Sequence, residues 1–83
     1  MTIYCLQKFS SQDQFETSVE EDFFATRELA VKALDECRKS YKEALIDGEP
    51  SFTFTEDSET MFDCTGGKWR YAYTVYPVDV KEA

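Results

Sequence analysis

The segment 26–46, TRELAVKALDECRKSYKEALI, decides the fold of this 83-residue chain. At about 100° per residue, its apolar side chains gather in one broad sector and nearly all its charges lie opposite. Thr26 is suited to cap the N-terminus, and Gly48 with Pro50 supplies a stop. Because no second stretch has this period, the sequence predicts one amphipathic helix that packs on a sheet built from both flanks.

The residues before the helix predict two antiparallel strands. Residues 2–9, TIYCLQKF, are rich in β-branched and aromatic side chains and carry apolar groups on both faces, as a central strand does. Residues 15–24, FETSVEEDFF, alternate apolar with polar side chains, which predicts a half-buried strand. Its predicted inward residues are Phe15, Thr17 and Val19. The polar segment 10–14, SSQDQ, is expected to turn the chain between the two strands.

Three further strands are predicted after the helix, over residues 51–56, 59–64 and 68–78. The loop DGEP at 47–50 precedes the first of them. The segment TGGK at 65–68 is the strongest turn in the chain, because paired glycines tolerate the positive φ angles of a tight hairpin. The last strand places on one face Trp69, Tyr71, Tyr73 and Val75. The polar tail 79–83 is expected to fray.

These elements predict an α+β fold, a single domain over residues 1–83 with the order ββαβββ. Its mainly antiparallel sheet packs one face on one long helix. A chain this short buries only roughly 60 to 65% of its unfolded surface, so it has room for one small core. One helix covers one face, and the other face is left to carry Tyr4, Tyr76 or the ladder that includes Trp69, depending on the strand register.

The residue types exclude most catalytic and metal chemistry. The chain has no histidine, so Cys–His and Ser–His–Asp nucleophilic schemes are ruled out. Cys5, Cys37 and Cys64 are odd in number and far apart, which indicates packing residues rather than a disulfide framework or a zinc site. We therefore predict no catalytic residue, no metal site and no cofactor, and a protein that is not an enzyme.

The placement of charge is the feature most relevant to function. Seventeen acids and nine bases give a net charge of −8, which repels nucleic acid and anionic membranes. The helix is nearly neutral, because its five bases offset its four acids. Two stretches without bases flank it, between Lys8 and Arg27 and between Lys42 and Lys68. The partner-binding residues predicted from these stretches are Glu16, Glu20, Glu21, Asp22, Glu56, Asp57, Glu59 and Asp63.

The acidic stretches admit two interpretations. They can serve solubility alone, as acidic side chains do in many small domains. They can also form a surface complementary to a basic groove, where charge speeds association and neighbouring aromatic side chains supply the main contacts. No run of 18 apolar residues exists, and the first residues, MTIYCLQKF, lack the features of a signal peptide, so a soluble cytoplasmic protein is expected.

With its acidic segments 15–24, FETSVEEDFF, and 56–64, EDSETMFDC, the chain resembles the small, acidic, one-domain inhibitors of host defence encoded by phages, such as anti-CRISPR proteins, and is similar in character to the acidic immunity proteins of nuclease toxins. The likeness is one of size, charge and expected element order. It implies a non-enzymatic inhibitor in the host cytoplasm that acts as a nucleic-acid mimic on the basic surface of a nucleic-acid-binding bacterial defence protein.

A second hypothesis belongs to a different class. The chain holds more aromatic residues than one helix can cover, so the uncovered sheet face or an edge strand could mediate homo-oligomerisation in a small assembly or adaptor module. Under this hypothesis the acidic side chains serve solubility and the partner is a second copy of the chain.

Overall fold

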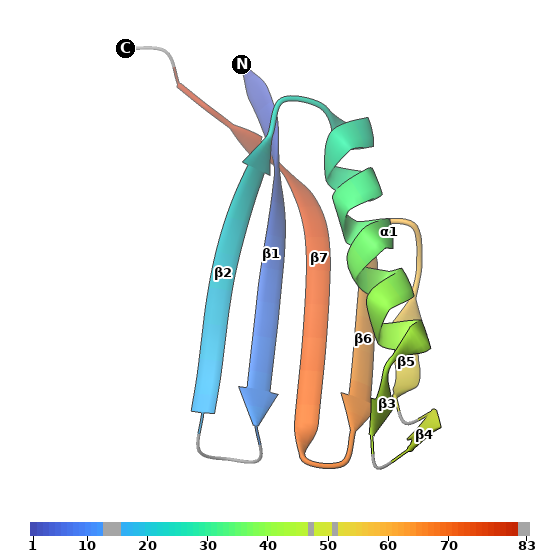
Figure 1. Ribbon diagram of the computed structural model, residues 1–83. Coiled ribbons are helices and arrows are strands. Elements are labelled where there is room, and N and C mark those ends of the chain that lie inside the picture. The colour runs from blue at the N-terminus through green and yellow to red at the C-terminus, as the bar shows by residue number, and fades with distance from the viewer. Residues whose placement is uncertain (13–15, 47, 51, 82–83) are drawn as a thin grey trace.

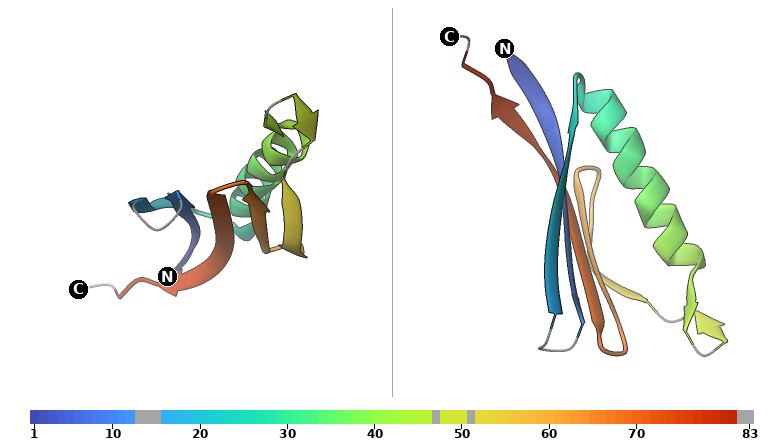
Figure 2. Two further views of the ribbon diagram at one scale, coloured as in Figure 1. Left: turned by 90° about the horizontal axis from the view of Figure 1, so that it is seen from below. Right: turned by 60° about the vertical axis from the view of Figure 1, so that its left-hand side comes forward.

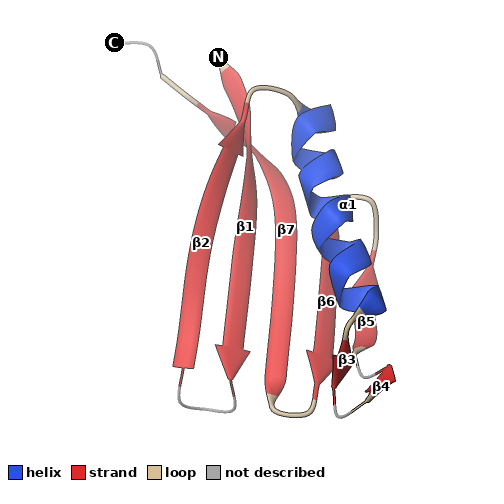
Figure 3. Ribbon diagram, viewed as in Figure 1, coloured by secondary structure: helices blue, strands red, loops and turns tan. Residues whose placement is uncertain are grey.

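The computed structural model describes residues 1–12, 16–46, 48–50 and 52–81. One helix packs on one face of a five-stranded antiparallel sheet whose strand order is β2-β1-β7-β6-β5 (Figures 1 and 3). The elements of this domain are β1 (Thr2–Gln12), β2 (Glu16–Phe24), α1 (Arg27–Glu43), β5 (Thr53–Asp57), β6 (Met61–Gly66) and β7 (Trp69–Asp79). A separate small hairpin is formed by β3 (Leu45–Ile46) and β4 (Glu49–Pro50). The α+β class and the predicted ββαβββ order are confirmed.

The helix begins where the sequence predicts and ends three residues early. The Leu29 N–H donates to Thr26 Oγ1 over 3.3 Å, which confirms Thr26 as the N-cap. At the other end, Ala44 takes an extended conformation, and the two residues after it pair with β4. Gly48, with φ of 82°, turns the hairpin of β3 and β4 instead of stopping the helix. The predicted extension to residue 46 is therefore wrong.

The strand register gathers one core beneath the helix. In the pairing of β1 with β7, Leu6 lies opposite Val75, and in the pairing of β6 with β7, Phe62 lies opposite Tyr73. The residues buried in this cluster are Leu6, Ala30, Leu34, Phe62, Cys64, Tyr73 and Val75. The shared face predicted for the last strand is confirmed, since Tyr73 and Val75 lie in this cluster and Tyr71 packs against it.

Aromatic rings fill the space under the C-terminal half of the helix. Figure 2 shows α1 and the sheet spreading apart toward that end, and the two buried residues of α1, Ala30 and Leu34, both lie in its first half. Tyr41 stacks on Tyr71 with 4.5 Å between ring centroids, and its hydroxyl lies 2.8 Å from the hydroxyl of Tyr73. Phe52 meets the Tyr41 ring edge-on at 5.4 Å. These aromatic rings thus fill the space that opens between the C-terminal half of α1 and the sheet.

The faces predicted for β2 are reversed. Lys8 lies opposite Glu20 in the register, so the even-numbered residues of β2 share the helix side with Leu6. Thr17 and Val19 consequently lie on the uncovered face, and Val19 is 51% exposed. The prediction that they face inward is wrong, because the register turns the even-numbered residues toward the helix side. The helix α1 packs mainly against β1 and β7, and in Figure 1 it lies well away from most of β2. Phe15 lies outside the described residues.

The turns and the C-terminal tail differ in detail from the predictions. Gly66 pairs with Trp69, so the tight turn consists of Gly67 and Lys68, and Gly67 has a φ of 60° that favours glycine. Residues 10–12 of the predicted turn belong to β1, and residues 13 and 14 lie outside the described residues. The tail prediction is partly wrong, since β7 reaches residue 79 and the Val80 N–H donates to the Met1 carbonyl over 2.7 Å.

On the uncovered face, one thiol is enclosed by polar neighbours. Cys5 is fully buried, and its thiol donates to Glu21 Oε2 over 3.4 Å. The Tyr76 hydroxyl donates to the same oxygen over 3.3 Å. Burial raises the pKa of the Cys5 thiol, which makes it a poor nucleophile. In the described part of the chain, no helix combines the length and the apolar content needed to cross a membrane.

Candidate protein-binding site

The eight predicted acidic residues lie on opposite edges of the sheet. Strand β2 carries Glu16, Glu20, Glu21 and Asp22, while β5, β6 and the loop between them carry Glu56, Asp57, Glu59 and Asp63. Because β1 and β7 separate these two groups, the fold does not bring them into one acidic patch. Each group therefore has to be considered with the bases near it.

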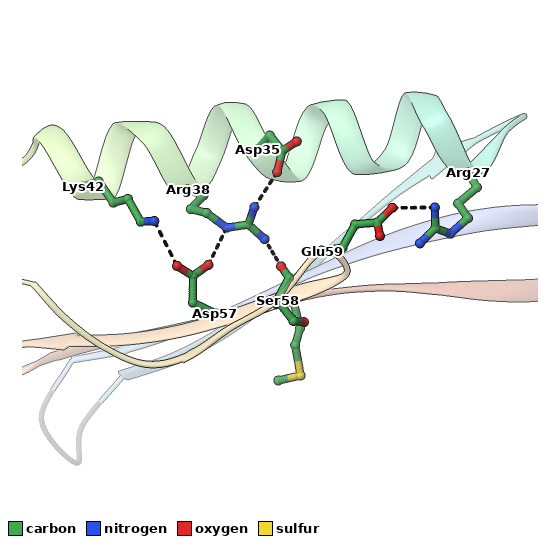
Figure 4. A network of polar contacts seen from close by, with 8 residues as sticks. Arg27, Asp35, Arg38, Lys42, Asp57, Ser58 and Glu59 are labelled. Atoms are coloured by element: carbon green, nitrogen blue, oxygen red, sulfur yellow. Dashed lines mark hydrogen bonds and ion pairs between the residues drawn. The ribbon is translucent and has the colours of Figure 1, made fainter.

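Two of the four acids of the β5–β6 edge, Asp57 and Glu59, pair with bases of the helix (Figure 4). Asp57 bridges two of them, with Oδ1 2.8 Å from Arg38 Nε and Oδ2 2.9 Å from Lys42 Nζ. Arg38 also donates to Asp35 and to the Ser58 carbonyl. The basic residues that face this loop recur on one flank of α1, as the helical period of 3.6 allows. The bases of α1 thus neutralise acids of the second acidic stretch, which lies between Lys42 and Lys68.

Two further ion pairs complete this edge. Arg27 at the start of α1 lies 2.7 Å from Glu59, and Arg70 of β7 lies 2.7 Å from Asp63 on the uncovered face. The Arg27 guanidinium, through its hydrogen bond, lowers the pKa of Glu59. Glu56 is exposed at the β-bulge of β5. The acids at this edge thus serve mainly to dock the loop and the helix.

The acids of β2 make fewer ion pairs than those of the β5–β6 edge in the described residues. Asp22 lies 2.9 Å from Lys8 Nζ, and this contact raises the pKa of Lys8. Glu21 accepts the hydrogen bonds from Cys5 and Tyr76. Glu16 and Glu20 are exposed, and within the described ranges neither makes an ion pair. This edge keeps most of its negative charge for solvent or for a partner.

Strand β2 also presents two different side-chain rows. The row on the helix side is Glu16, Ser18, Glu20 and Asp22, and the row on the uncovered side is Thr17, Val19, Glu21 and Phe23. Phe23 is 57% exposed beside Val19, so the uncovered row is partly apolar. Figure 1 shows β2 as the outermost strand, with no described segment beyond it.

The strand at the opposite edge, β5, has features that discourage pairing with another chain, and β2 lacks them. Strand β5 has five residues against nine in β2, and its register shifts between Phe54 and Glu56 at a β-bulge. Short edge strands and bulges discourage pairing with another chain. The open edge of this sheet is therefore β2, and it is the candidate site.

A small polar depression adjoins the foot of β2. Its volume is about 380 Å³, and its lining includes Ser10, Glu16, Ser18 and Trp69. Trp69 is 38% exposed and stacks on Tyr71 at an interplanar angle of 4°, which holds the indole in place. A carboxylate beside an aromatic face suits a cationic side chain. Sequence reasoning missed this corner, because it depends on the pairing of Gln12 with Trp69 across β1 and β7.

Replacing Asp57 by asparagine is expected to destabilise the domain by about 1 to 2 kcal/mol. The Arg38 side chain is only 16% exposed and would lose one of its two charged partners, keeping Asp35, while Lys42 would lose its contact as well. Urea denaturation followed by circular dichroism measures the loss. Glu59→Gln removes the exposed pair with Arg27 and should leave the midpoint nearly unchanged. Equal losses of stability in the two variants would show that the pair of Asp57 with Arg38 stabilises the domain no more than the exposed pair of Glu59 with Arg27 does.

The described residues place no group of three or more acidic or cysteine side chains so that it could hold a metal ion. The candidate site is thus an edge strand with exposed acids, exposed apolar residues and an adjoining depression. Searches for similar proteins found no matching family model, no matching curated protein and no matching solved structure.

Proposed function

We propose that this chain is a non-enzymatic acidic binding protein that inhibits a nucleic-acid-handling protein by occupying its basic surface, with β2 as the docking edge. One observation carries the proposal: the acids of the β5–β6 edge are mostly paired with the chain's own bases, whereas Glu16 and Glu20 of β2 stay exposed. Of the eight predicted acids, those that are exposed and make no ion pair or side-chain hydrogen bond within the described residues are Glu16 and Glu20 on β2 and Glu56 on β5. Only β2 carries two of them.

The chemistry of β2 suits such a partner. Alternate residues on a strand lie on the same face, so Glu16 and Glu20 place two exposed negative charges along the helix-side row of this edge, next to Asp22, which is paired with Lys8. A partner that binds phosphates with lysine and arginine would be attracted to this row, and the net charge of −8 would speed the encounter. Val19 and Phe23 on the other row would add apolar contacts.

Reversing the charge on β2 is expected to weaken binding at least tenfold. The variant Glu16→Lys/Glu20→Lys changes two exposed carboxylates that make no described ion pair, so the fold should persist. Nucleic-acid-binding proteins captured from a nuclease-treated bacterial lysate are purified, and their binding to a labelled oligonucleotide is titrated with each form of this chain. The wild type should displace the oligonucleotide at a one-to-one ratio, and less well as salt rises from about 50 to 500 mM.

The control has the same net charge at a different place. Glu28→Lys/Glu43→Lys alters two exposed acids of α1 and should displace the oligonucleotide as the wild type does. Their opposite positions on the helix dipole also make their effects on stability offset each other. The proposal fails if captured proteins keep their nucleic acid, or if both double variants act alike.

A second candidate function is self-association through the uncovered sheet face. The observation that favours it is the apolar character of that face near β2, where Val19 lies opposite Phe9 and Phe23 lies opposite Cys5. Light scattering at tens of micromolar decides between a monomer and a dimer. A strict monomer at this concentration would exclude this candidate.

A further inference from the structure

The outer backbone of β2 is an unused hydrogen-bonding edge. In an antiparallel sheet, every second residue of an edge strand directs its N–H and C=O groups away from the sheet. Strand β2 offers such groups over nine residues, and the only strand that it pairs with in the described chain is β1. An extended segment of another chain can add itself to an edge of this kind.

A second copy of this chain is a poor occupant. Two β2 strands related by a twofold axis would run antiparallel, and each central register sets carboxylates against one another. One register places Glu20 opposite Glu20, the next places Glu21 opposite Glu21, and a third places Glu16 opposite Asp22. Like charges directly opposite each other destabilise a strand pair. The edge therefore selects a strand of opposite charge.

We propose that the β2 edge binds an extended basic segment of its partner by strand addition, with basic residues alternating with apolar ones. This inference rests on the proposed function and specifies how the partner is recognised. The basic residues would lie along the helix-side row beside Glu16, Glu20 and Asp22. The apolar residues would lie on the uncovered side beside Val19 and Phe23, because neighbouring strands in a sheet share the same two faces.

The depression at the foot of β2 supports the same choice of partner. Glu16 and Trp69 both line it, and both lie on the helix side of the sheet. A lysine or arginine at the corresponding end of the added strand would lie next to Glu16 on β2, whereas Trp69 lies two strands further in, on β7. Such a cation is favoured by the Glu16 carboxylate at the rim of the depression. The exposed acids of β2, the spacing of Val19 and Phe23 and the acidic rim of the depression thus all favour a partner strand in which basic and apolar residues alternate.

The test compares two peptides that are as long as β2 and have identical composition. One alternates lysine with valine, and the other has its lysines in one block and its valines in a second block. Binding is measured by fluorescence anisotropy at about 0.15 M salt, where surface charge is screened beyond roughly 8 Å. We expect the alternating peptide to bind at least tenfold more tightly than the block peptide.

Backbone pairing has its own readout. We expect the amide hydrogens of β2 that point outward to exchange quickly in the free protein, and the alternating peptide to slow their exchange at least tenfold. The block peptide should not. The variant Glu16→Lys/Glu20→Lys should lose binding to the alternating peptide, while Glu28→Lys/Glu43→Lys should retain it.

Three results would overturn the inference: equal affinity for both peptides, unprotected β2 amides in the complex, or β2 amides already protected by self-association without peptide. None of these results would decide the proposed function, which the oligonucleotide displacement assay tests separately. The reverse case is also distinguishable. An alternating peptide that binds and protects β2, with no nucleic-acid-binding protein displaced, would support strand addition and refute the proposed target.

Discussion

Replacing Phe62 by alanine is expected to leave the domain barely stable, with a loss of about 3 to 5 kcal/mol. Phe62, the second residue of β6, is fully buried, and its ring centroid lies 5.0 Å from that of Tyr73 and 5.7 Å from that of Phe54. The Arg38 guanidinium lies 5.8 Å from the same ring. Because small domains have only about 5 to 15 kcal/mol of stability, the cavity would remove a large part of it.

Urea denaturation followed by circular dichroism measures this loss, and Phe23→Ala is the matched control. Phe23 is the same residue type on the same sheet but is 57% exposed, so its truncation should change stability by no more than about 0.5 kcal/mol. If Phe62→Ala fails to fold, Phe62→Leu keeps most of the volume and should show a smaller, measurable loss. Similar losses for Phe62→Ala and Phe23→Ala would contradict the core described here.

Local signals explain why the helix and the element order could be predicted. The helical period and the Thr26 cap act within a few residues, so the sequence contains the whole signal. The predicted helix end is too late because Leu45 continues the apolar sector, while the pairing of residues 45 and 46 with β4 forms a separate hairpin that no local pattern indicates. Leu29 likewise belongs to the predicted apolar sector but is 51% exposed.

The faces of β2 could not be predicted because they depend on contacts between distant parts of the chain. A period of two shows that a strand has two faces but not which face the helix covers. That choice follows from β1 and β7, which pair across nearly the whole length of the chain, and from the helix that crosses above them. Val19 was therefore placed inward although it is exposed at the sheet edge.

The candidate site was predicted only in part for the same reason. The sequence shows that two stretches lack bases, but it does not show which acids meet bases from elsewhere in the fold. Arg38 and Lys42 meet Asp57, so this acid became structural, whereas Glu16 and Glu20 remain open. Whether the open acids bind a partner stays a prediction for the displacement assay.

Raising the pH above about 9 is expected to destabilise the domain progressively and then unfold it cooperatively. Burial raises the pKa of the Cys64 thiol to about 11. Burial also raises the pKa of Tyr73, and it raises that of Tyr41 together with the hydrogen bond between the two hydroxyls. The folded state thus holds protons that the unfolded chain releases near pH 8.5 for a thiol and near pH 10 for a phenol.

The sign of the effect follows from these directions. A group with a raised pKa contributes its full stabilisation below the unfolded pKa and loses it as the pH rises toward the folded pKa. Each proton retained by the folded state lowers stability by about 1.4 kcal/mol for every pH unit in that window. Urea midpoints measured by circular dichroism at a series of pH values report the slope, and tyrosinate absorbance reports the phenols.

The variant Cys64→Ala separates the buried thiol from general charge repulsion. Added negative charge on a chain that already carries −8 lowers stability at high pH in every variant. Only the wild type has a proton on Cys64 to lose, so its stability should fall more steeply between about pH 9 and 11 than that of the variant. The comparison uses slopes, because removing the buried sulfur lowers stability at all pH values. Equal slopes, or full tyrosinate absorbance while the protein is still folded, would contradict the prediction.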